Sequence, residues 1–149
     1  MDLFDRTEYE RWLAACDDEL AAARHNATGG FHHVAVLHAE QAAQCALKGL
    51  LHGVGAGAQA RGHGLASLAE RCAHAAGLAL NDAAREALAD LAREYLPARY
   101  PDALPEGTPA QHYGAGSASR ALTTAEQVRD LVQATWQRLH EEAADDEPT

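Results

Sequence analysis

The sequence predicts an all-α fold, an antiparallel up-down bundle of four to five helices with a long proline-rich loop before the last helix. Apolar or small residues recur every three or four positions along most of the chain, which is the spacing of one helix face. Alanine supplies much of the apolar content of 47%, whereas aromatic residues make up 5%. A β-sheet would need more β-branched and aromatic residues. The length of 149 residues suits one domain with a single core.

The composition narrows the classes of function. A formal net charge of −10 argues against a surface that holds nucleic acid through bulk charge, although a local basic pocket is compatible with it. Cys16, Cys45 and Cys72 stand far apart, so we expect free, buried thiols in a reducing compartment. Because the chain shows neither a leader nor an apolar run of about 18 residues, we expect a cytoplasmic protein without membrane contact.

The histidine pattern argues against a metal site. The chain has nine histidines, but His32 and His33 are adjacent, and no two stand four residues apart beside an acidic residue. The glycine-rich segment 53–64 also lacks the Lys-Ser/Thr ending of a phosphate-binding P-loop. We therefore expect no metal and no bound cofactor.

The central element is a helix predicted over His33–Gly53. One apolar stripe runs along it, and a second set of mostly apolar residues covers another face, as in a helix that is surrounded by other helices. We therefore expect the functional surface to lie on other elements. The stripe consists of Val36, Ala39, Ala43, Leu47, Leu50 and Val54.

Capping and breaking residues define three flanking helices. The first is expected over residues 5–24, followed by a turn at residues 26–30. The third is expected over residues 63–77, after the glycine-rich loop. The fourth has Asn81 as its N-cap and stops at Pro97.

The last helix is predicted to open with the capping box Thr123-x-x-Glu126, in which two side chains satisfy free backbone N–H groups. Acidic residues from Glu141 to Glu147 indicate a solvated chain end. The expected organisation is one helical domain over residues 1–140, followed by a disordered acidic tail over residues 141–149.

The segment from Pro97 to Ser119 contains four prolines, whose spacing predicts that no helix forms within it. A loop of this length inside a small domain is usually functional or disordered. Its arginine, tyrosine and histidine side chains are not typical of a flexible linker. We therefore expect a functional loop.

Four segments of the chain resemble the HEPN domain, the nucleotide-binding helical bundle of higher eukaryotes and prokaryotes. They keep the order and spacing of that family from residue 5 to residue 140. The segments are Glu40–Leu51 (EQAAQCALKGLL), Gly62–Leu65 (GHGL), Arg99–Ala103 (RYPDA) and Pro105–Tyr113 (PEG…HY).

This resemblance implies a nucleotide-binding bundle that is usually a homodimer and is often encoded beside a minimal nucleotidyltransferase as a toxin–antitoxin pair. Many members are metal-independent ribonucleases with an Arg-x4-6-His motif. In this chain seven residues separate Arg24 from His32 and twelve separate Arg99 from His112, so that motif is missing. The sequence leaves open whether the chain is an enzyme.

Arg99 is the main candidate for a site residue, because a guanidinium can bind a phosphate or carboxylate through two hydrogen bonds. It can equally pair with Asp102 or cap carbonyls at the preceding helix end. His112 is the second candidate for catalysis, as a general base, and Tyr113 can stack on a nucleobase or accept an adenylyl group. The alternative is that His112 and Tyr113 pack the loop onto the bundle. We expect the loop to bring Arg99 close to both.

Lys48, His63 and Asp102 complete the predicted ligand-binding set. Lys48 faces away from the apolar stripe and either reaches a phosphate or extends into solvent. His63 either caps the third helix or points into the same cleft. Asp102 either makes an Asx turn or contributes to the site.

Three functions fit these residues. The first is a nucleotide-binding or regulatory bundle that partners a minimal nucleotidyltransferase. The second is a ribonuclease in which Arg99 and His112 meet in space, and the third is a non-catalytic interaction module. The expected partners are thus a nucleotide or RNA, the nucleotidyltransferase, and a second copy of the chain that contacts Trp12 or Trp136 on a helix exterior.

Overall fold

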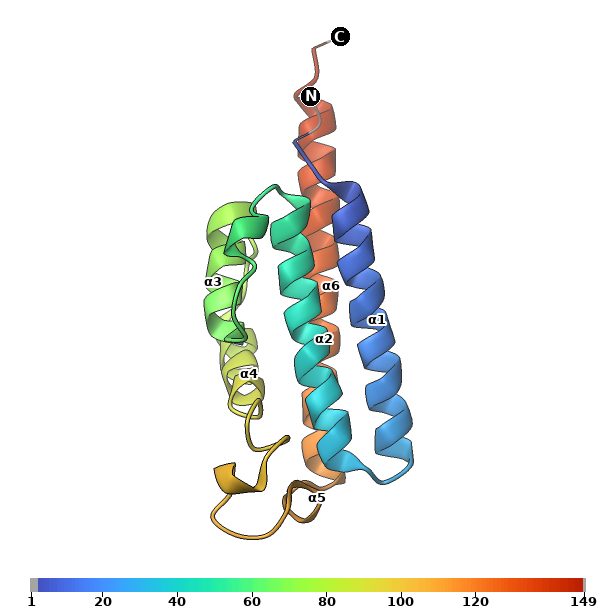
Figure 1. Ribbon diagram of the computed structural model, residues 1–149. Helices are drawn as coiled ribbons and strands as arrows, with labels where there is room; N and C mark the ends of the chain where they lie inside the picture. The colour runs from blue at the N-terminus through green and yellow to red at the C-terminus, as the bar shows by residue number, and fades with distance from the viewer. Residues whose placement is uncertain (1–2, 149) are drawn as a thin grey trace.

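The computed structural model describes residues 3–148, and over that range it contains helices and no strands, which confirms the all-α prediction. Three long helices, α1 (Arg6–Thr28), α2 (His32–Gly53) and α6 (Ala115–Asp145), lie side by side (Figure 1). Two shorter ones, α3 (Leu65–Ala76) and α4 (Asp82–Ala92), cover another side of the bundle. The remaining short elements are η1 (Gly57–Gln59), η2 (Pro101–Ala103) and α5 (Pro109–His112).

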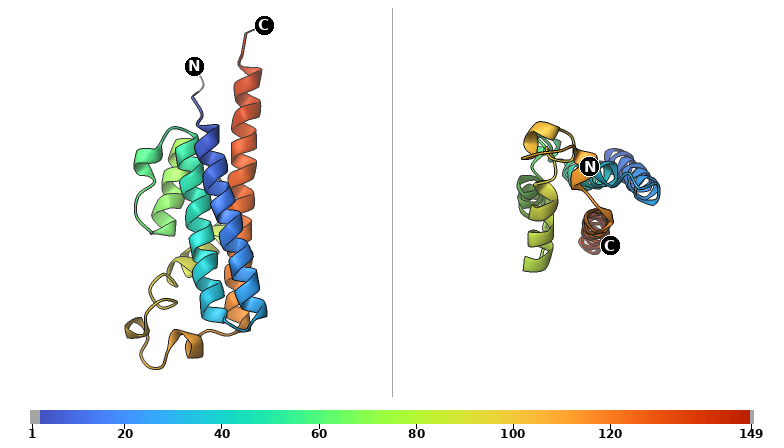
Figure 2. Two further views of the ribbon diagram at one scale, coloured as in Figure 1. Left: turned by 45° about the vertical axis from the view of Figure 1, so that its right-hand side comes forward. Right: turned by 90° about the horizontal axis from the view of Figure 1, so that it is seen from below.

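The connections place the proline-rich loop at one end of the bundle. α1 descends and α2 ascends in Figure 1, and the chain then turns back along the bundle before α3 begins. α4 and α6 run in opposite directions, so α4 ends and α6 begins at the end where α1 passes into α2 (Figures 1 and 2). None of the helices within residues 3–148 is both long and apolar enough to span a membrane.

α2 is the central helix, as predicted. It contacts α1, α3 and α6, and buried residues occupy most of its circumference. Gly49 allows α1 to approach closely, because a Cβ atom at this position would lie 2.8 Å from the Cβ of Trp12. A closely packed centre of this kind excludes water from most of α2. The large side chains that are fully buried include Val36, Leu47, Leu50 and Leu51.

α1 begins at the predicted place and ends later than predicted. The side chain of Asp5 accepts a hydrogen bond from the backbone N–H of Glu8 at 3.0 Å, which caps the first turn. Asn26 was expected in the turn, but its side chain donates to the Ala22 carbonyl at 2.8 Å and the helix continues to Thr28. The turn is instead made by residues 29–31.

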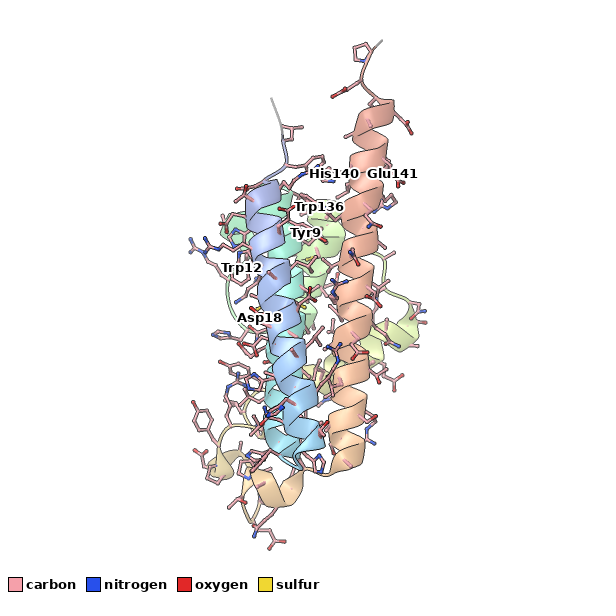
Figure 3. The ribbon with its side chains drawn as sticks, turned by 90° about the vertical axis from the view of Figure 1, so that its right-hand side faces the viewer. Tyr9, Trp12, Asp18, Trp136, His140 and Glu141 are labelled. Carbon is pink, nitrogen blue, oxygen red and sulfur yellow. The ribbon has the colours of Figure 1, made fainter. Side chains whose placement is uncertain are left out.

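Trp136 does not lie on the helix exterior. Its side chain is 8% exposed and stacks on Tyr9 with ring centroids 4.0 Å apart, between α1 and α6 (Figure 3). The prediction of Trp136 as an exposed dimer anchor is therefore wrong, because the buried face of α6 includes Trp136 beside Val132 and Thr135. Trp12 is half-buried and stacks on His52.

The cysteine thiols are free, and those of Cys16 and Cys72 are buried, as predicted. Cys45 is half-buried. Burial raises the pKa of Cys16 and of Cys72 to about 12, so neither thiol ionises near neutral pH. These two side chains therefore contribute to packing and are poor nucleophiles.

α3 and α4 begin as predicted, but α4 ends early. Gly77 ends α3 in the left-handed conformation with φ of 70°, and Asn81 caps α4 by accepting from the Ala84 N–H. α4 stops at Ala92 rather than at Pro97, because the next N–H groups bond to carbonyls three residues back and tighten the chain. We call the resulting segment, residues 93–100, the 93–100 turn.

The prediction that the last helix begins with a capping box at Thr123 is wrong. α6 begins at Ala115 after Gly114, and Thr123 lies inside it, because the small residues before Thr123 are compatible with a helix and Ala118 and Ala121 are buried by it. α6 also continues to Asp145, stabilised by an Arg138–Glu142 ion pair at 3.1 Å. Residues 141–145 of the predicted tail are therefore helical.

The prediction that no helix forms between Pro97 and Ser119 is also wrong. α5 lies within this segment and is capped reciprocally by Thr108 and Gln111. Pro109 occupies its first position, where the missing N–H costs nothing. The prolines limit helix length here but still permit single turns.

Candidate functional site

Arg99 lies at the end of the 93–100 turn and is already bonded within the protein. Its Nη1 donates to the Tyr95 carbonyl at 2.7 Å, and its guanidinium lies 4.2 Å from the centre of the Tyr95 ring. Its Nη2 is 3.9 Å from a carboxylate oxygen of Glu40, and the side chain is 17% exposed. One predicted role was to cap carbonyls at the helix end, but α4 ends at Ala92, and Arg99 binds a carbonyl of the following turn instead. An ion pair with Asp102 is not formed, because the carboxylate partner is Glu40.

Glu40 is fully buried on α2. Gln44 Nε2 donates to one carboxylate oxygen at 2.5 Å, and Gln41 Nε2 donates to the other at 2.9 Å. Burial raises the pKa of the Glu40 carboxyl. The two hydrogen bonds oppose this rise in pKa, as do the electrostatic effects of Arg99 and His63.

Sequence reasoning missed Glu40 because it assigned α2 to the core and the functional surface to other elements. The middle of the helix carries a buried polar group instead, formed by Glu40, Gln41 and Gln44. A signal was present: Glu40 stands four residues after Val36 and seven before Leu47, in register with fully buried positions. A charged residue at such a position requires a buried partner.

His63 joins the same cluster from the segment before α3. Its Nδ1 lies 3.2 Å from Oε1 of Gln44, and its ring stacks on Tyr95 with centroids 5.1 Å apart. The structure thus brings two of the predicted site residues, Arg99 and His63, to the same tyrosine. Both contacts help to hold the 93–100 turn against α2.

Tyr113 lies elsewhere, between α5 and α6, and is buried. Its hydroxyl donates to the carboxylate of Glu94, and burial followed by this hydrogen bond raises the pKa of the phenol. His112 is exposed on α5 and contacts Tyr113 edge to face at 4.9 Å. Within residues 3–148, no hydrogen bond, ion pair or ring contact links Arg99 to His112 or Tyr113.

Asp102 and Lys48 lie outside both groups. Asp102 is exposed in η2, and Lys48 is half-buried on α2. Neither side chain makes a hydrogen bond or ion pair in the described part of the chain. Residues 3–148 also contain no group of three or more histidine, cysteine or acidic residues that could hold a metal ion.

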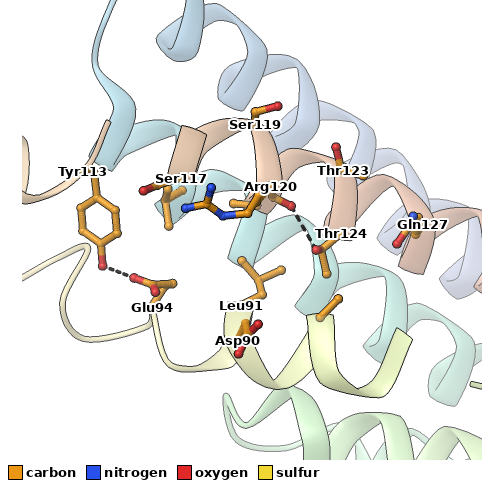
Figure 4. Close-up of a pocket in the computed structure, with 13 residues that line it drawn as sticks. Asp90, Leu91, Glu94, Tyr113, Ser117, Ser119, Arg120, Thr123, Thr124 and Gln127 are labelled. Carbon is orange, nitrogen blue, oxygen red and sulfur yellow. Dashed lines mark hydrogen bonds between the residues drawn. The ribbon is translucent and has the colours of Figure 1, made fainter. Parts of the chain in front are cut away.

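A cleft of about 360 Å³ lies between α4 and α6 (Figure 4). Its α4 wall carries the carboxylates of Asp90 and Glu94, and its α6 wall carries Arg120 together with serine and threonine hydroxyls. Arg120 makes no ion pair or side-chain hydrogen bond within residues 3–148. The lining residues are Val36, Ala87, Asp90, Leu91, Glu94, Tyr113, Ser117, Ser119, Arg120, Ala121, Thr123, Thr124 and Gln127.

Among the residues that line this cleft, Tyr113 was predicted from the sequence as a site residue, whereas Arg120 was not. Arg120 was missed because it falls between the predicted loop and the predicted start of the last helix. With α6 beginning at Ala115, Arg120 and Thr124 are spaced as neighbours on one helix face, which Figure 4 shows directed into the cleft. The wrong helix boundary concealed this face.

Comparison with known proteins agrees with the fold. The HEPN domain family model matches residues 9–135. The crystal structure of TT1696 from Thermus thermophilus is similar with a TM-score of 0.76 and 31% identity, covering 85% of this chain and 97% of that one. The structure of ST0689, an archaeal HEPN homologue, is similar with a TM-score of 0.68 and 28% identity, covering 85% and 95%. No curated protein matched the chain. The chain belongs to the HEPN-domain family.

Proposed function

We propose that this HEPN chain is a nucleotide-binding regulatory module and that the nucleotide binds in the α4–α6 cleft. The observation that carries the proposal is the division of the cleft into two walls of opposite character. Arg120 on α6 faces carboxylates on α4, and its guanidinium has no acidic partner of its own within residues 3–148. A ligand that is anionic at one end and rich in hydrogen-bond donors at the other complements both walls.

A nucleotide has this chemistry. The guanidinium of Arg120 and the hydroxyls of Ser117 and Thr123 suit a phosphate group. The carboxylate of Glu94 suits ribose hydroxyls or an exocyclic amine of the base, and the Leu91 side chain offers apolar contact. A cavity of about 360 Å³ falls in the range of small-molecule sites.

Titration calorimetry with AMP tests the proposal. Arg120→Ala should weaken AMP binding at least about tenfold, because a hydrogen bond to a charged group contributes about 1.5–3 kcal/mol. Arg11→Ala is the matched control, since Arg11 lies on α1, is mostly exposed and pairs with Glu8. Equal affinities for wild type and Arg120→Ala would exclude the cleft as the nucleotide site.

The ribonuclease alternative has less support, because Arg99 is bonded to Glu40 and Tyr95 while His112 lies on α5. We expect no RNA cleavage by the purified chain. Cleavage that disappears in Arg99→Ala or in His112→Ala would favour the ribonuclease and count against the regulatory module.

The partners proposed are a second copy of the chain and a minimal nucleotidyltransferase, with the two proteins acting as a toxin–antitoxin pair in the cytoplasm. Their support is the HEPN family membership. Of the predicted ligand-binding residues, Tyr113 lines the cleft. Arg99, Asp102, His112, Lys48 and His63 do not line it and stay proposed contacts for these partners. Co-expression of the chain with a minimal nucleotidyltransferase, followed by co-purification, tests this pairing.

A further inference from the structure

The 93–100 turn contacts three separate segments of the chain through three side chains. Glu94 accepts from the Tyr113 hydroxyl, just before α6. Tyr95 stacks on His63, which lies in the segment before α3, and Arg99 reaches Glu40 on α2. The turn therefore connects the polar cluster on α2 with the α4–α6 cleft, because Glu94 belongs to the cleft and Arg99 to the cluster.

We propose that Glu40 and Arg99 are positioning residues that hold the 93–100 turn so that Glu94 faces the α4–α6 cleft. The part of this inference that concerns ligand affinity rests on the proposed function. The part that concerns the orientation of Glu94 does not depend on any ligand.

The strength of the connection comes from the burial of Glu40. A carboxylate that is 0% exposed cannot be solvated by bulk water and must be satisfied by protein groups. Gln41 and Gln44 supply hydrogen bonds, and Arg99 supplies the positive charge.

Arg99 transmits this constraint to the backbone of the turn. The same guanidinium that lies near Glu40 donates to the Tyr95 carbonyl and covers the Tyr95 ring. Glu94 is the residue next to Tyr95, and its own carbonyl accepts the Ala98 N–H at 3.1 Å. Fixing Arg99 therefore fixes the backbone on the C-terminal side of Glu94.

Burial raises the pKa of the Tyr113 phenol, and the hydrogen bond and charge of the Glu94 carboxylate raise it further, so the phenol reports the position of Glu94. In Arg99→Met we expect the pKa of Tyr113 to fall by about one unit as Glu94 moves away. Removing a positive charge would by itself raise the pKa of a phenol, so a fall identifies the movement. Tyr113→Phe identifies the Tyr113 signal in an ultraviolet or NMR titration of the four tyrosines.

Amide hydrogen exchange supplies a second measurement. In Arg99→Met and in Glu40→Gln, the amides of Ala98 and Tyr100 should exchange about tenfold faster, while those of Leu47 and Leu50 in the core of α2 keep their wild-type rates. Arg99→Lys retains the charge and should restore most of the protection. Arg85→Met is the matched control, because Arg85 lies on α4 just before the turn and pairs with Glu70 on α3, and neither residue lines the cleft.

AMP affinity completes the test. Arg99→Met should weaken AMP binding about fivefold, because a site residue without its support leaves its productive position, and Arg85→Met should not. If the wild-type chain does not bind AMP, the proposed function fails, and the Tyr113 titration still decides the present inference. The inference would be overturned if Arg99→Met had the same Tyr113 pKa as wild type and the same rate of amide exchange in the 93–100 turn. Equally faster exchange of the turn and of the α2 core would overturn it too, because the effect would then be general destabilisation.

Discussion

Glu40 is a carboxyl group enclosed within a helical bundle, and its ionisation opposes folding. Burial raises its pKa in the folded chain, so the folded chain binds this proton more tightly than the unfolded chain does. The resulting stabilisation is complete below the pKa of an unfolded glutamate, about 4.3. It is lost as the pH rises through the higher pKa of the folded state.

Glu40→Gln removes this titration. We expect the free energy of unfolding of the variant, relative to wild type, to increase between about pH 4 and about pH 7.5. Urea unfolding at both pH values measures this difference in free energy. The variant also loses the Arg99 contact, which changes its stability at both pH values. The test is therefore the change in the difference between the two pH values and not the difference at either one. Glu86→Gln, at an exposed position on α4, should show no such slope. A difference between Glu40→Gln and wild type that is the same at both pH values would contradict the prediction.

Some site residues could be identified from the sequence, and others could not. Arg99 and His63 could be selected because their chemistry and motif context are visible locally, and the structure brings both to Tyr95. Glu40 could have been selected from its register among buried positions. Pairing Arg99 with Glu40 could not be predicted, because 58 intervening residues separate them and only the packing of the turn on α2 joins them.

Among the elements, α2 depends on small residues for its contacts. At Gly49 an added Cβ would lie 2.8 Å from the Cβ of Trp12, an atom that cannot rotate away. Overpacking of this kind costs about 1–3 kcal/mol, whereas replacing a helical glycine by alanine gains about 1 kcal/mol. The steric cost therefore exceeds the gain in helix propensity.

We expect Gly49→Ala to lower the free energy of unfolding by up to about 2 kcal/mol, measured by urea unfolding. Gly116→Ala is the control, because it is an exposed glycine of α6 whose nearest contact is the flexible end of Arg120. That variant should be unchanged or more stable. Equal effects of the two substitutions would show that α1 and α2 adjust to the added methyl group.

The helix ends show which local sequence signals were sufficient to predict a helix boundary. Asn81 and Gly77 act through their own side chain or backbone freedom, and both boundaries were predicted. The Thr123-x-x-Glu126 pattern is compatible with a helix interior as well as with a helix start, and burial of Ala118 and Ala121 decides between them. Burial depends on the rest of the fold, so this boundary could not be read locally.

For the whole molecule, periodicity and composition were sufficient to predict an all-α bundle, since each long helix has its own apolar face. The α4–α6 cleft was not predictable in the same way. Its two walls come from helices that are adjacent only because the proline-rich loop returns the chain to the end where α4 stops. The cleft is therefore a property of the chain path rather than of any motif.

The exposed apolar side chains bear on the proposed homodimer. The large exposed ones are Leu3, Phe31, Leu96 and Tyr100. Phe31 belongs to the turn between α1 and α2, and Leu96 and Tyr100 belong to the 93–100 turn, two segments at the same end of the bundle (Figure 1). Apolar and aromatic side chains of this kind concentrate at the centre of protein interfaces.

We expect the chain to be a dimer in light-scattering measurements at several concentrations, and the double substitution Leu96→Ser and Tyr100→Ser to shift it to monomer. Both side chains are more than half exposed, at 52% and 53%, so the fold should persist. Leu3→Ser is the matched control because Leu3 is 76% exposed and lies outside both turns. A monomeric wild type would refute the dimer, whereas a dimer that survives the double substitution would place its interface on another face of the bundle.

Since Leu96 and Tyr100 lie in the segment that carries Glu94, a dimer formed there would also restrict movement of that segment, and AMP affinity should then rise with protein concentration.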